Sequence, residues 1–417
     1  LVELGKALAA VDKNAEAESV FRRATLVSSN EWKCWANLGV FLGNAALSVL
    51  FSKNASNIPD SLSTPGRIPS PTVWDQYRPT PELLKKSESL CQEASQCFNR
   101  ALAIAPKEPE VFFQRAGYLT ASNSLNYCLR YYRGEEKFSM VEWVKAFLPP
   151  GMIADLKQAS ALKPKDYQYL SFAVYSECLI FAMKGDVDHL ALNMLPDEMQ
   201  KSVRAALTRL ENLSEDADKK IAVGALENLG ILNIFLGNQS GAIANFRRAV
   251  KLDPMREQIW GLFIGFLWES ASVDELRAAA ESQLKARDSA RNHIILSKVF
   301  AQKLSRWKEA AEQAQIAARQ ETNDVVPLLM QVAIALKQSS STNYLSVAET
   351  NIINATAILK KMPDGDEKTD RARELMSNFA IYCALVNQPE AAKKYANEIL
   401  KKFPDDETAK EILKALN

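Results

Sequence analysis

The side chains that most often do chemistry in proteins are sparse in this sequence. His189 and His293 are the only histidines among its 417 residues. A histidine binds a metal or moves a proton when another histidine, a cysteine or a carboxylate stands at a suitable spacing, and neither histidine has such a neighbour. We therefore predict that His189 lies at a helix end and His293 near the start of a helix, both without a catalytic or metal-binding role.

Motifs that hold a phosphate or activate a nucleophile are also missing. The sequence contains no GxxxxGKS/T, no GxGxxG and no GxSxG pattern. Such patterns wrap backbone amides around a phosphate or expose a serine on a sharp turn. We predict no catalytic residue, no cofactor and no metal, and hence a protein that is not an enzyme.

The cysteines form no metal-binding or redox motif. None belongs to a CxxC pair and all fall in stretches of helical periodicity, at Cys34, Cys91, Cys97, Cys128, Cys178 and Cys383. We interpret them as small buried hydrophobic residues in a reducing compartment. No signal peptide is visible, so we predict a cytoplasmic protein. Because Leu1 falls inside an expected helix, we interpret the chain as a fragment that lacks its N-terminus.

The charge balance is nearly neutral. The chain has 51 basic and 50 acidic residues and a net charge of +1. This balance gives no electrostatic reason to bind nucleic acid or an anionic membrane. The longest near-continuous apolar run, residues 259–268, is about half as long as a membrane-spanning helix. We therefore expect neither nucleic acid as a partner nor membrane insertion.

Two amphipathic helices are predicted within residues 223–254. Apolar and small side chains recur at helical spacing in each half, at Leu226, Leu229, Gly230 and Ile234 and then at Ala242, Phe246, Ala249 and Val250. Gly237 and Asn238 stand between the halves and tolerate a positive φ, so they predict a turn. Pro254 follows the second helix and cannot continue it.

This hairpin resembles the tetratricopeptide repeat (TPR) family. The family has an apolar residue, Leu-Gly, Ala, an aromatic residue, Ala and Pro, and these places hold Leu226, Leu229, Gly230, Ala242, Phe246, Ala249 and Pro254. Asn233 departs from the pattern, since the family usually has a large apolar residue there. Leu226 is followed at 34-residue steps by Trp260, Ile294 and Leu328. A period of this length is typical of stacked helical hairpins.

We therefore predict an all-α fold, a right-handed superhelical solenoid of about nine stacked TPR hairpins with two insertions in the N-terminal half. Residues 1–222 are expected to hold irregular units, and residues 223–404 more regular ones. Residues 405–417 are expected to form a capping helix, because the end of a solenoid would otherwise expose its apolar face.

The first insertion is proline-rich and spans about residues 51–81. Phe21 and Phe98 lie 77 residues apart, which exceeds one repeat by 43 residues. Six prolines between Pro59 and Pro81 exclude a helix. This segment could be a surface loop, a regulatory segment in the protein's own groove, or a docking motif for an outside partner.

The second insertion is aromatic and spans about residues 127–150. Its aromatic residues alternate with arginines and lysines, a pattern that can stack on nucleotide bases. Glutamates nearby offset the positive charge, and aromatic residues at helical spacing are usually core residues. We therefore favour a core role for this stretch over nucleic-acid binding.

The resemblance implies that the first helix of each hairpin lines a concave groove that binds a peptide or helix of a partner. The family's groove positions correspond here to Glu227, Ile231, Ile234, Phe235, Gln258, Gly261, Gly265, Trp268, Asn292, Ile295, Val299 and Gln302. Gly261 and Gly265 would leave open backbone, with Trp268 as an aromatic anchor. Alternatively, these residues pack against a neighbouring unit or the proline-rich insertion. The clamp for acidic chaperone tails is broken at Glu110 and Gln114.

These observations predict a non-catalytic protein–protein interaction scaffold, a subunit of a multiprotein complex, that binds a peptide or helix in its groove. One alternative is the helical targeting or substrate-recruiting region of a larger enzyme, for example a glycosyltransferase. A weaker alternative is an RNA-binding helical repeat, against which the neutral net charge argues.

Overall fold

The computed structural model describes residues 1–51, 79–137, 139–185, 190–270, 272–338 and 342–416. The regular elements within these ranges are all helical, and none of them is a strand. The prediction of an all-α fold is thus confirmed. His189 and most of the proline-rich insertion predicted at residues 51–81 lie outside the described residues.

The helices form two compact units, Leu1–Leu252 and Asp253–Asn417, called here the first and second units. The first unit contains α1 (Val2–Ala10), α2 (Asn14–Val27), α3 (Trp32–Phe51), α6 (Pro81–Ile104), α7 (Pro109–Tyr132), α8 (Met140–Phe147), α9 (Pro150–Leu162), α10 (Tyr167–Gly185), the 3₁₀ helix η2 (Leu192–Met194), α11 (Asp197–Leu213), α12 (Lys219–Phe235) and α13 (Gln239–Leu252). The second unit contains α14 (Glu257–Ser270), α15 (Val273–Ala286), α16 (Ala290–Lys298), the π-helical turn η3 (Val299–Lys303), α17 (Trp307–Gln320), α18 (Val326–Lys337), α19 (Thr342–Lys361), α20 (Asp366–Leu385), α21 (Pro389–Lys402) and α22 (Glu407–Ala415).

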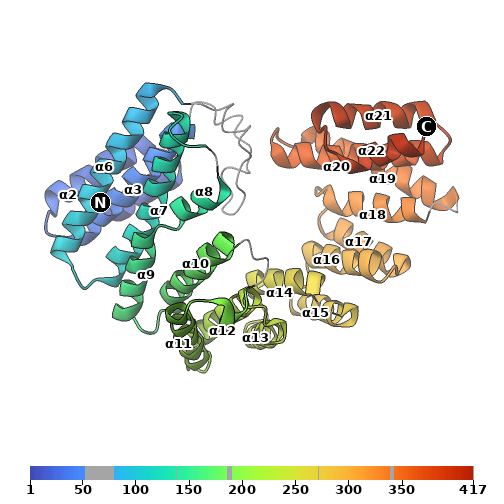
Figure 1. The fold of residues 1–417 in the computed structure, drawn as a ribbon. Coiled ribbons are helices and arrows are strands. Elements are labelled where there is room, and N and C mark those ends of the chain that lie inside the picture. Colours follow the sequence, from blue (N-terminus) through green and yellow to red (C-terminus); the bar gives the residue numbers. More distant parts are fainter. Residues whose placement is uncertain (52–78, 138, 186–189, 271, 339–341, 417) are drawn as a thin grey trace. The chain divides into compact units, whose positions relative to one another are not determined.

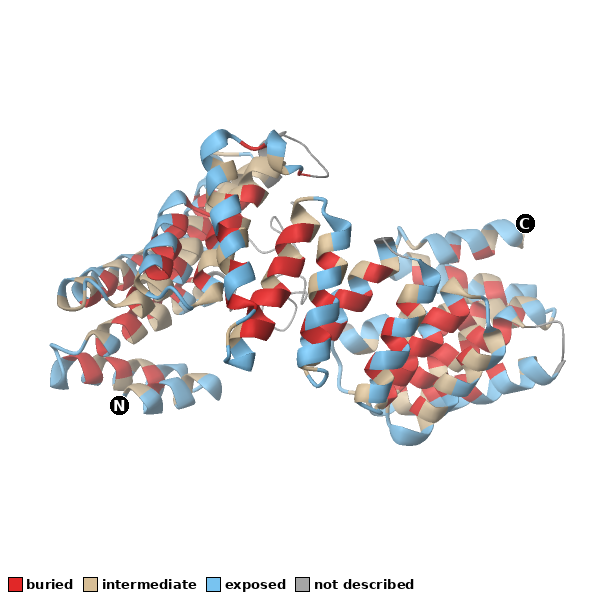
Figure 2. Ribbon diagram, turned by 90° about the horizontal axis from the view of Figure 1, so that it is seen from below, coloured by how far each residue is buried: buried red, intermediate tan, exposed pale blue. Residues whose placement is uncertain are grey.

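Within each unit, consecutive helices pack as hairpins. The pairs are α1 with α2, α3 with α6, α7 with α9, α10 with α11 and α12 with α13 in the first unit, and α14 with α15, α16 with α17, α18 with α19 and α20 with α21 in the second. Buried residues occupy one side of most helices and exposed residues the other (Figure 2). This arrangement follows from the amphipathic pattern, because each apolar face is buried only against a neighbouring helix. The predicted helical hairpins are confirmed.

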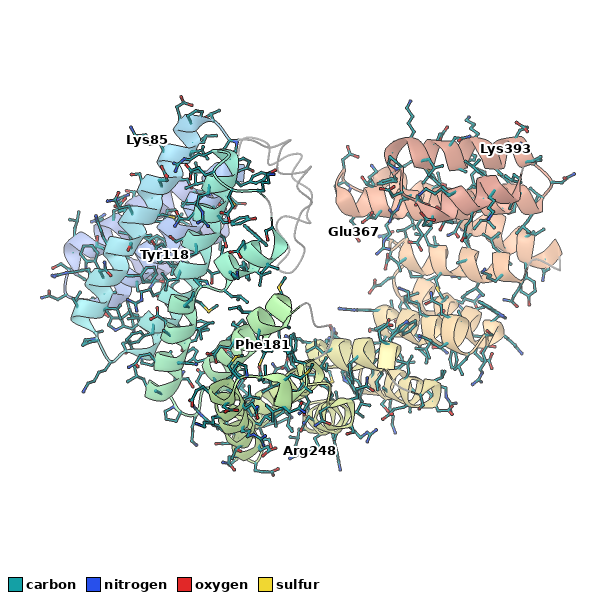
Figure 3. The ribbon with its side chains drawn as sticks, in the orientation of Figure 1. Lys85, Tyr118, Phe181, Arg248, Glu367 and Lys393 are labelled. Carbon is teal, nitrogen blue, oxygen red and sulfur yellow. The ribbon has the colours of Figure 1, made fainter. Side chains whose placement is uncertain are left out.

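Three hairpins share one close contact between a glycine and a phenylalanine ring. A Cβ atom added to the glycine would lie within 2.7–2.9 Å of a ring carbon in the pairs Gly5–Phe21, Gly39–Phe98 and Gly230–Phe246. Phe98 also stacks on Tyr118, with 5.1 Å between the ring centroids. Figure 3 labels Tyr118 on α7. The Gly39–Phe98 pair joins α3 to α6, which are adjacent in space although residues 52–80 separate them in sequence.

Left-handed turns connect the two helices of several hairpins. Gly237 has a φ of 69° between α12 and α13, and Asn387 has a φ of 58° between α20 and α21. The predicted turn at Gly237 and Asn238 is therefore present. Asn233, the departure from the family pattern, accepts a hydrogen bond from Asn238 Nδ2 at 2.7 Å and donates one to the Leu229 carbonyl at 2.8 Å. A buried amide is tolerated at this position because both of its ends are satisfied.

The aromatic stretch mostly contributes to the core of the first unit. Tyr127 and Tyr132 belong to α7 and are buried, and Trp143 on α8 packs edge-on against Tyr127 at 5.6 Å. The Tyr127 hydroxyl donates to the Ser139 carbonyl and accepts from the Ser139 amide. Packing against α7 and α10 thus holds α8 in place.

No helix in the described part of the chain is both long and apolar enough to cross a lipid bilayer.

At the C-terminal end, α22 places Ala409 and Ile412 in the core and leaves Lys410 and Lys414 exposed.

The cysteines are buried and unpaired, which leads to a prediction about their reactivity. Burial raises the pKa of the Cys97 thiol to about 11 and that of Cys128 further still. Because the thiolate is the nucleophile, iodoacetamide at pH 8 should modify the native protein slowly, and urea should release all six thiols. Mass spectrometry of the alkylated protein measures this. Rapid labelling of Cys97 or Cys128 before unfolding would contradict the packing of α6 and α7.

Candidate functional site

An apolar pocket of about 320 Å³ lies between α10 and α12 in the first unit. Each of these helices is the first helix of its hairpin. Its lining consists of uncharged residues, namely Ser171, Phe172 and Tyr175 from α10 and Asn228, Ile231 and Leu232 from α12. Figure 3 shows the side chains of both helices and labels Phe181 on α10. The spacing of the lining residues, about one helical turn, puts each set on one face of its helix.

Aromatic side chains pack at both ends of the α12 face that lines this pocket. At one end, Tyr167 covers Gly224 so closely that an added Cβ would lie 2.0 Å from the ring carbon Cζ. At the other end, Tyr175 packs edge-on against Phe235 with 4.2 Å between the ring centroids. Between these contacts, the pocket lining occupies about one turn of α12, from Asn228 to Leu232.

Two polar groups at the pocket retain hydrogen-bonding capacity. Asn228 Nδ2 donates to the Gly224 carbonyl at 2.8 Å, while Asn228 Oδ1 accepts no hydrogen bond from the described residues. Burial raises the pKa of the Tyr175 hydroxyl, which also has no hydrogen-bond partner in the described part of the chain. A ligand with an N–H group could satisfy either oxygen.

The groove residues predicted on α12 fall into two groups. Ile231 lines the pocket and Phe235 packs at its end, whereas Ile234 is half-buried on the same helix. Glu227 is only 5% exposed and offers almost no surface to a ligand.

Sequence reasoning missed the α10 wall of the pocket. Tyr167 precedes residue 223 by 56 residues, which is no multiple of the 34-residue period. The repeat register therefore could not be carried to Phe172 or Tyr175. A usable signal was the helical spacing of Tyr167, Ser171 and Tyr175, which marks one face of this helix.

In the second unit, the groove residues predicted on α14 differ in how exposed they are. Gln258, Gly261 and Gly265 are exposed, and a Cβ added to either glycine would meet no atom within 4 Å. Trp268 is half-buried, and the Lys303 ammonium lies 4.9 Å from its ring centroid and donates to its carbonyl at 2.8 Å. This cation–π contact occupies one face of the ring expected to act as an anchor.

Two of the four groove residues predicted on α16 and η3 are buried. Asn292 is 2% exposed and donates to the Arg287 carbonyl, and Val299 is 0% exposed. Ile295 is half-buried and Gln302 is exposed. The π turn begins at Val299, so the residues after it, including Gln302, do not keep the α-helical spacing used for the prediction.

The residues that define the hairpin at 223–254 occupy its core. Leu226, Leu229, Gly230, Ala242, Phe246 and Ala249 are buried, while Pro254 is exposed and accepts a hydrogen bond from Trp260 Nε1 at 2.8 Å. These contacts hold α12 so that Ile231 faces the pocket.

Histidine, cysteine and carboxylate side chains are the groups that could bind a metal or move a proton, and the structure gives His293 a carboxylate neighbour, Asp288, that was not expected from the sequence. No set of three His, Cys, Asp or Glu side chains there could hold a metal ion. His293 is buried, with Nδ1 2.7 Å from Gln313 Oε1 and Nε2 2.9 Å from Asp288 Oδ1. Hydrogen bonds from Gln320 and His293 lower the pKa of the Asp288 carboxyl. Both ring nitrogens thus have structural partners near the start of α16.

Comparisons with known proteins bear on the repeat. Residues 223–254 match the family model of the tetratricopeptide repeat. The C-terminal part of a TPR repeat-containing protein from Cytophaga hutchinsonii is 14% identical, covers 72% of this chain and 99% of its own, and has a TM-score of 0.43. Yeast Tom70 is 14% identical over 99% of this chain and 87% of its own, with a TM-score of 0.40. YrrB, described as a TPR protein with an unusual peptide-binding site, is 18% identical over 50% of this chain and 98% of its own, with a TM-score of 0.35. No curated protein matches the sequence.

Proposed function

We propose that this chain, a tetratricopeptide repeat protein by the match of residues 223–254, is a non-catalytic scaffold that binds a peptide or helix of another protein. The observation that carries the proposal is the uncharged pocket between α10 and α12, which is formed by first helices of successive hairpins. Apolar concave sites with a few polar groups are the usual form of binding sites.

The face of α14 supports a second contact region in the other unit. Gly261 and Gly265 expose backbone on one side of the helix, next to Gln258 and the 36%-exposed Leu262. Glycines allow another backbone to approach closely. We propose that both regions bind a partner separately, Ile231 of the α10–α12 pocket in the first unit and Gly261 and Gly265 of α14 in the second.

We propose a protein rather than a nucleic acid as the partner. The net charge of +1 supplies little attraction for phosphates, and the pocket lining contains no arginine or lysine. We also propose that the chain is one subunit of a multiprotein complex, because a scaffold functions by binding other proteins.

Substitution of Ile231 by aspartate, combined with Trp268→Ala, tests both regions. A charge in the apolar pocket and the loss of the Trp268 ring should reduce capture of a co-purifying protein by about tenfold or more. Quantitative mass spectrometry after affinity capture measures the loss, and circular dichroism checks the fold. Ile353→Asp is the matched control, because Ile353 is 62% exposed on α19 and should capture normally. Equal capture by the double variant and the control would reject both regions.

A further inference from the structure

We propose that the α10–α12 pocket admits one large uncharged side chain, aromatic or long aliphatic, from a peptide and rejects charged side chains. The proposal rests on the proposed function and narrows it to the chemistry of the ligand. It is carried by the lining of the pocket, its bounded length and the hydrogen-bonding groups at its wall.

The length of the pocket argues for a single side chain. Tyr167 lies over Gly224 at one end of the α12 face, and Phe235 packs against Tyr175 at the other. Between them the lining spans about one turn of each helix, Ser171 to Tyr175 and Asn228 to Leu232, which is shorter than the apolar stripe of a docked helix. An extended peptide can insert one residue into a lining of this length.

The electrostatics argue for an uncharged side chain. None of the lining side chains is ionised at neutral pH. Glu177, further along α10, does not line the pocket, and its Oε1 atom is paired with Lys157 Nζ at 2.6 Å, which offsets its charge. A charged ligand group would lose its hydration and find no partner, which makes burial unfavourable. An apolar group instead covers Phe172, whose residue surface is 59% exposed.

The remaining polar groups argue for a peptide over a pure hydrocarbon. Asn228 Oδ1 and the Tyr175 hydroxyl have unused hydrogen-bonding capacity toward the described residues. A peptide brings N–H groups next to each side chain, and these can donate to both oxygens. The Ser171 hydroxyl already donates to the Tyr167 carbonyl at 2.7 Å, which holds it in place.

Defined amino-acid amides test the proposal on the full chain. N-acetyl-tryptophan amide and N-acetyl-leucine amide should shift the methyl NMR signals of Ile231 and Leu232 in a saturable manner. N-acetyl-lysine amide and N-acetyl-glutamate amide should bind about tenfold more weakly or worse. Charged amides that shift these methyl signals as strongly as the leucine amide would overturn the proposal, as would the absence of any shift with all four probes.

Phe172→Ala removes an exposed ring of the pocket without disturbing buried packing. It should weaken binding of the apolar probes by about fivefold or more, while Tyr344→Ala, at a residue that is 37% exposed on α19, should leave their binding unchanged. Equal binding by both variants would contradict the assignment.

Selection from a phage-displayed library of linear peptides separates this inference from the proposed function. Peptides with a shared aromatic or aliphatic residue that lose binding on Phe172→Ala support the inference. Peptides that bind regardless of Phe172→Ala and Ile231→Asp overturn the inference and leave the scaffold function standing. If no peptide binds, and Ile231→Asp with Trp268→Ala also leaves protein capture unchanged, the proposed scaffold function is wrong.

Discussion

Replacement of Gly230 by leucine should destabilise the first unit by about 1–3 kcal/mol through overpacking. Even a single added Cβ would lie 2.7 Å from Cε1 and Cζ of the Phe246 ring. The ring cannot swing into solvent, because Phe246 is 0% exposed in the core of the α12–α13 hairpin. Either the two helices move apart or the ring leaves its rotamer, and both changes cost free energy. Urea unfolding followed by circular dichroism measures the loss, and hydrogen exchange of the α12 amides locates it.

The matched control for this substitution is Gly117→Leu in the same unit. Gly117 is exposed on α7, and a Cβ added there would meet no atom within 4 Å. Leucine is a better helix former than glycine by roughly 0.8 kcal/mol, so this variant should be neutral or slightly more stable. If Gly230→Leu and Gly117→Leu melt alike, the close pairing of α12 with α13 is wrong.

The same glycine shows why the hairpin could be predicted from sequence. Gly230 and Phe246 are 16 residues apart, as are Gly5 and Phe21, and this spacing reports a local contact across a short turn. The helical period, the small residue and the aromatic ring all indicate the same close pairing of two helices. Residues near one another in the sequence are therefore enough to predict the hairpin. Gly39 and Phe98 make the same contact across the proline-rich segment, and only the excess of 43 residues over one repeat reveals it in the sequence.

The candidate site was less predictable, because it depends on contacts between hairpins. The covering of Gly224 by Tyr167 requires the path of the chain through α11, and no local pattern encodes that path. The contact of Lys303 with Trp268 is an intermediate case, since the two residues are 35 positions apart, close to one repeat. The π turn at Val299–Lys303 carries no glycine or proline signal, so its departure from α-helical spacing was not foreseeable.

Removal of the Arg115 guanidinium should lower the free energy of unfolding more than removal of the carboxylate of its partner, Asp155. Arg115 Nε donates to Asp155 Oδ2 at 2.7 Å and Nη2 donates to Oδ1 at 2.5 Å, which ties α7 to α9. The Asp155 side chain is 6% exposed, whereas that of Arg115 is 28% exposed. Arg115→Met therefore strands a buried carboxylate and should cost about 3–5 kcal/mol. Asp155→Leu leaves a guanidinium that can still reach water, so it should cost less.

The double variant Arg115→Met with Asp155→Leu distinguishes a stranded charge from lost packing. Replacing both partners by apolar side chains removes the unpaired carboxylate, so most of the stability lost in Arg115→Met should return. Lys201→Met serves as the control for an exposed pair, since the Lys201 and Glu198 side chains are 72% and 86% exposed, and should change stability by less than about 1 kcal/mol. Urea midpoints of the four variants measure these differences. If Arg115→Met is no worse than Lys201→Met, the α7–α9 ion pair contributes nothing to the third hairpin, and packing of Ala116 against α9 must hold it alone.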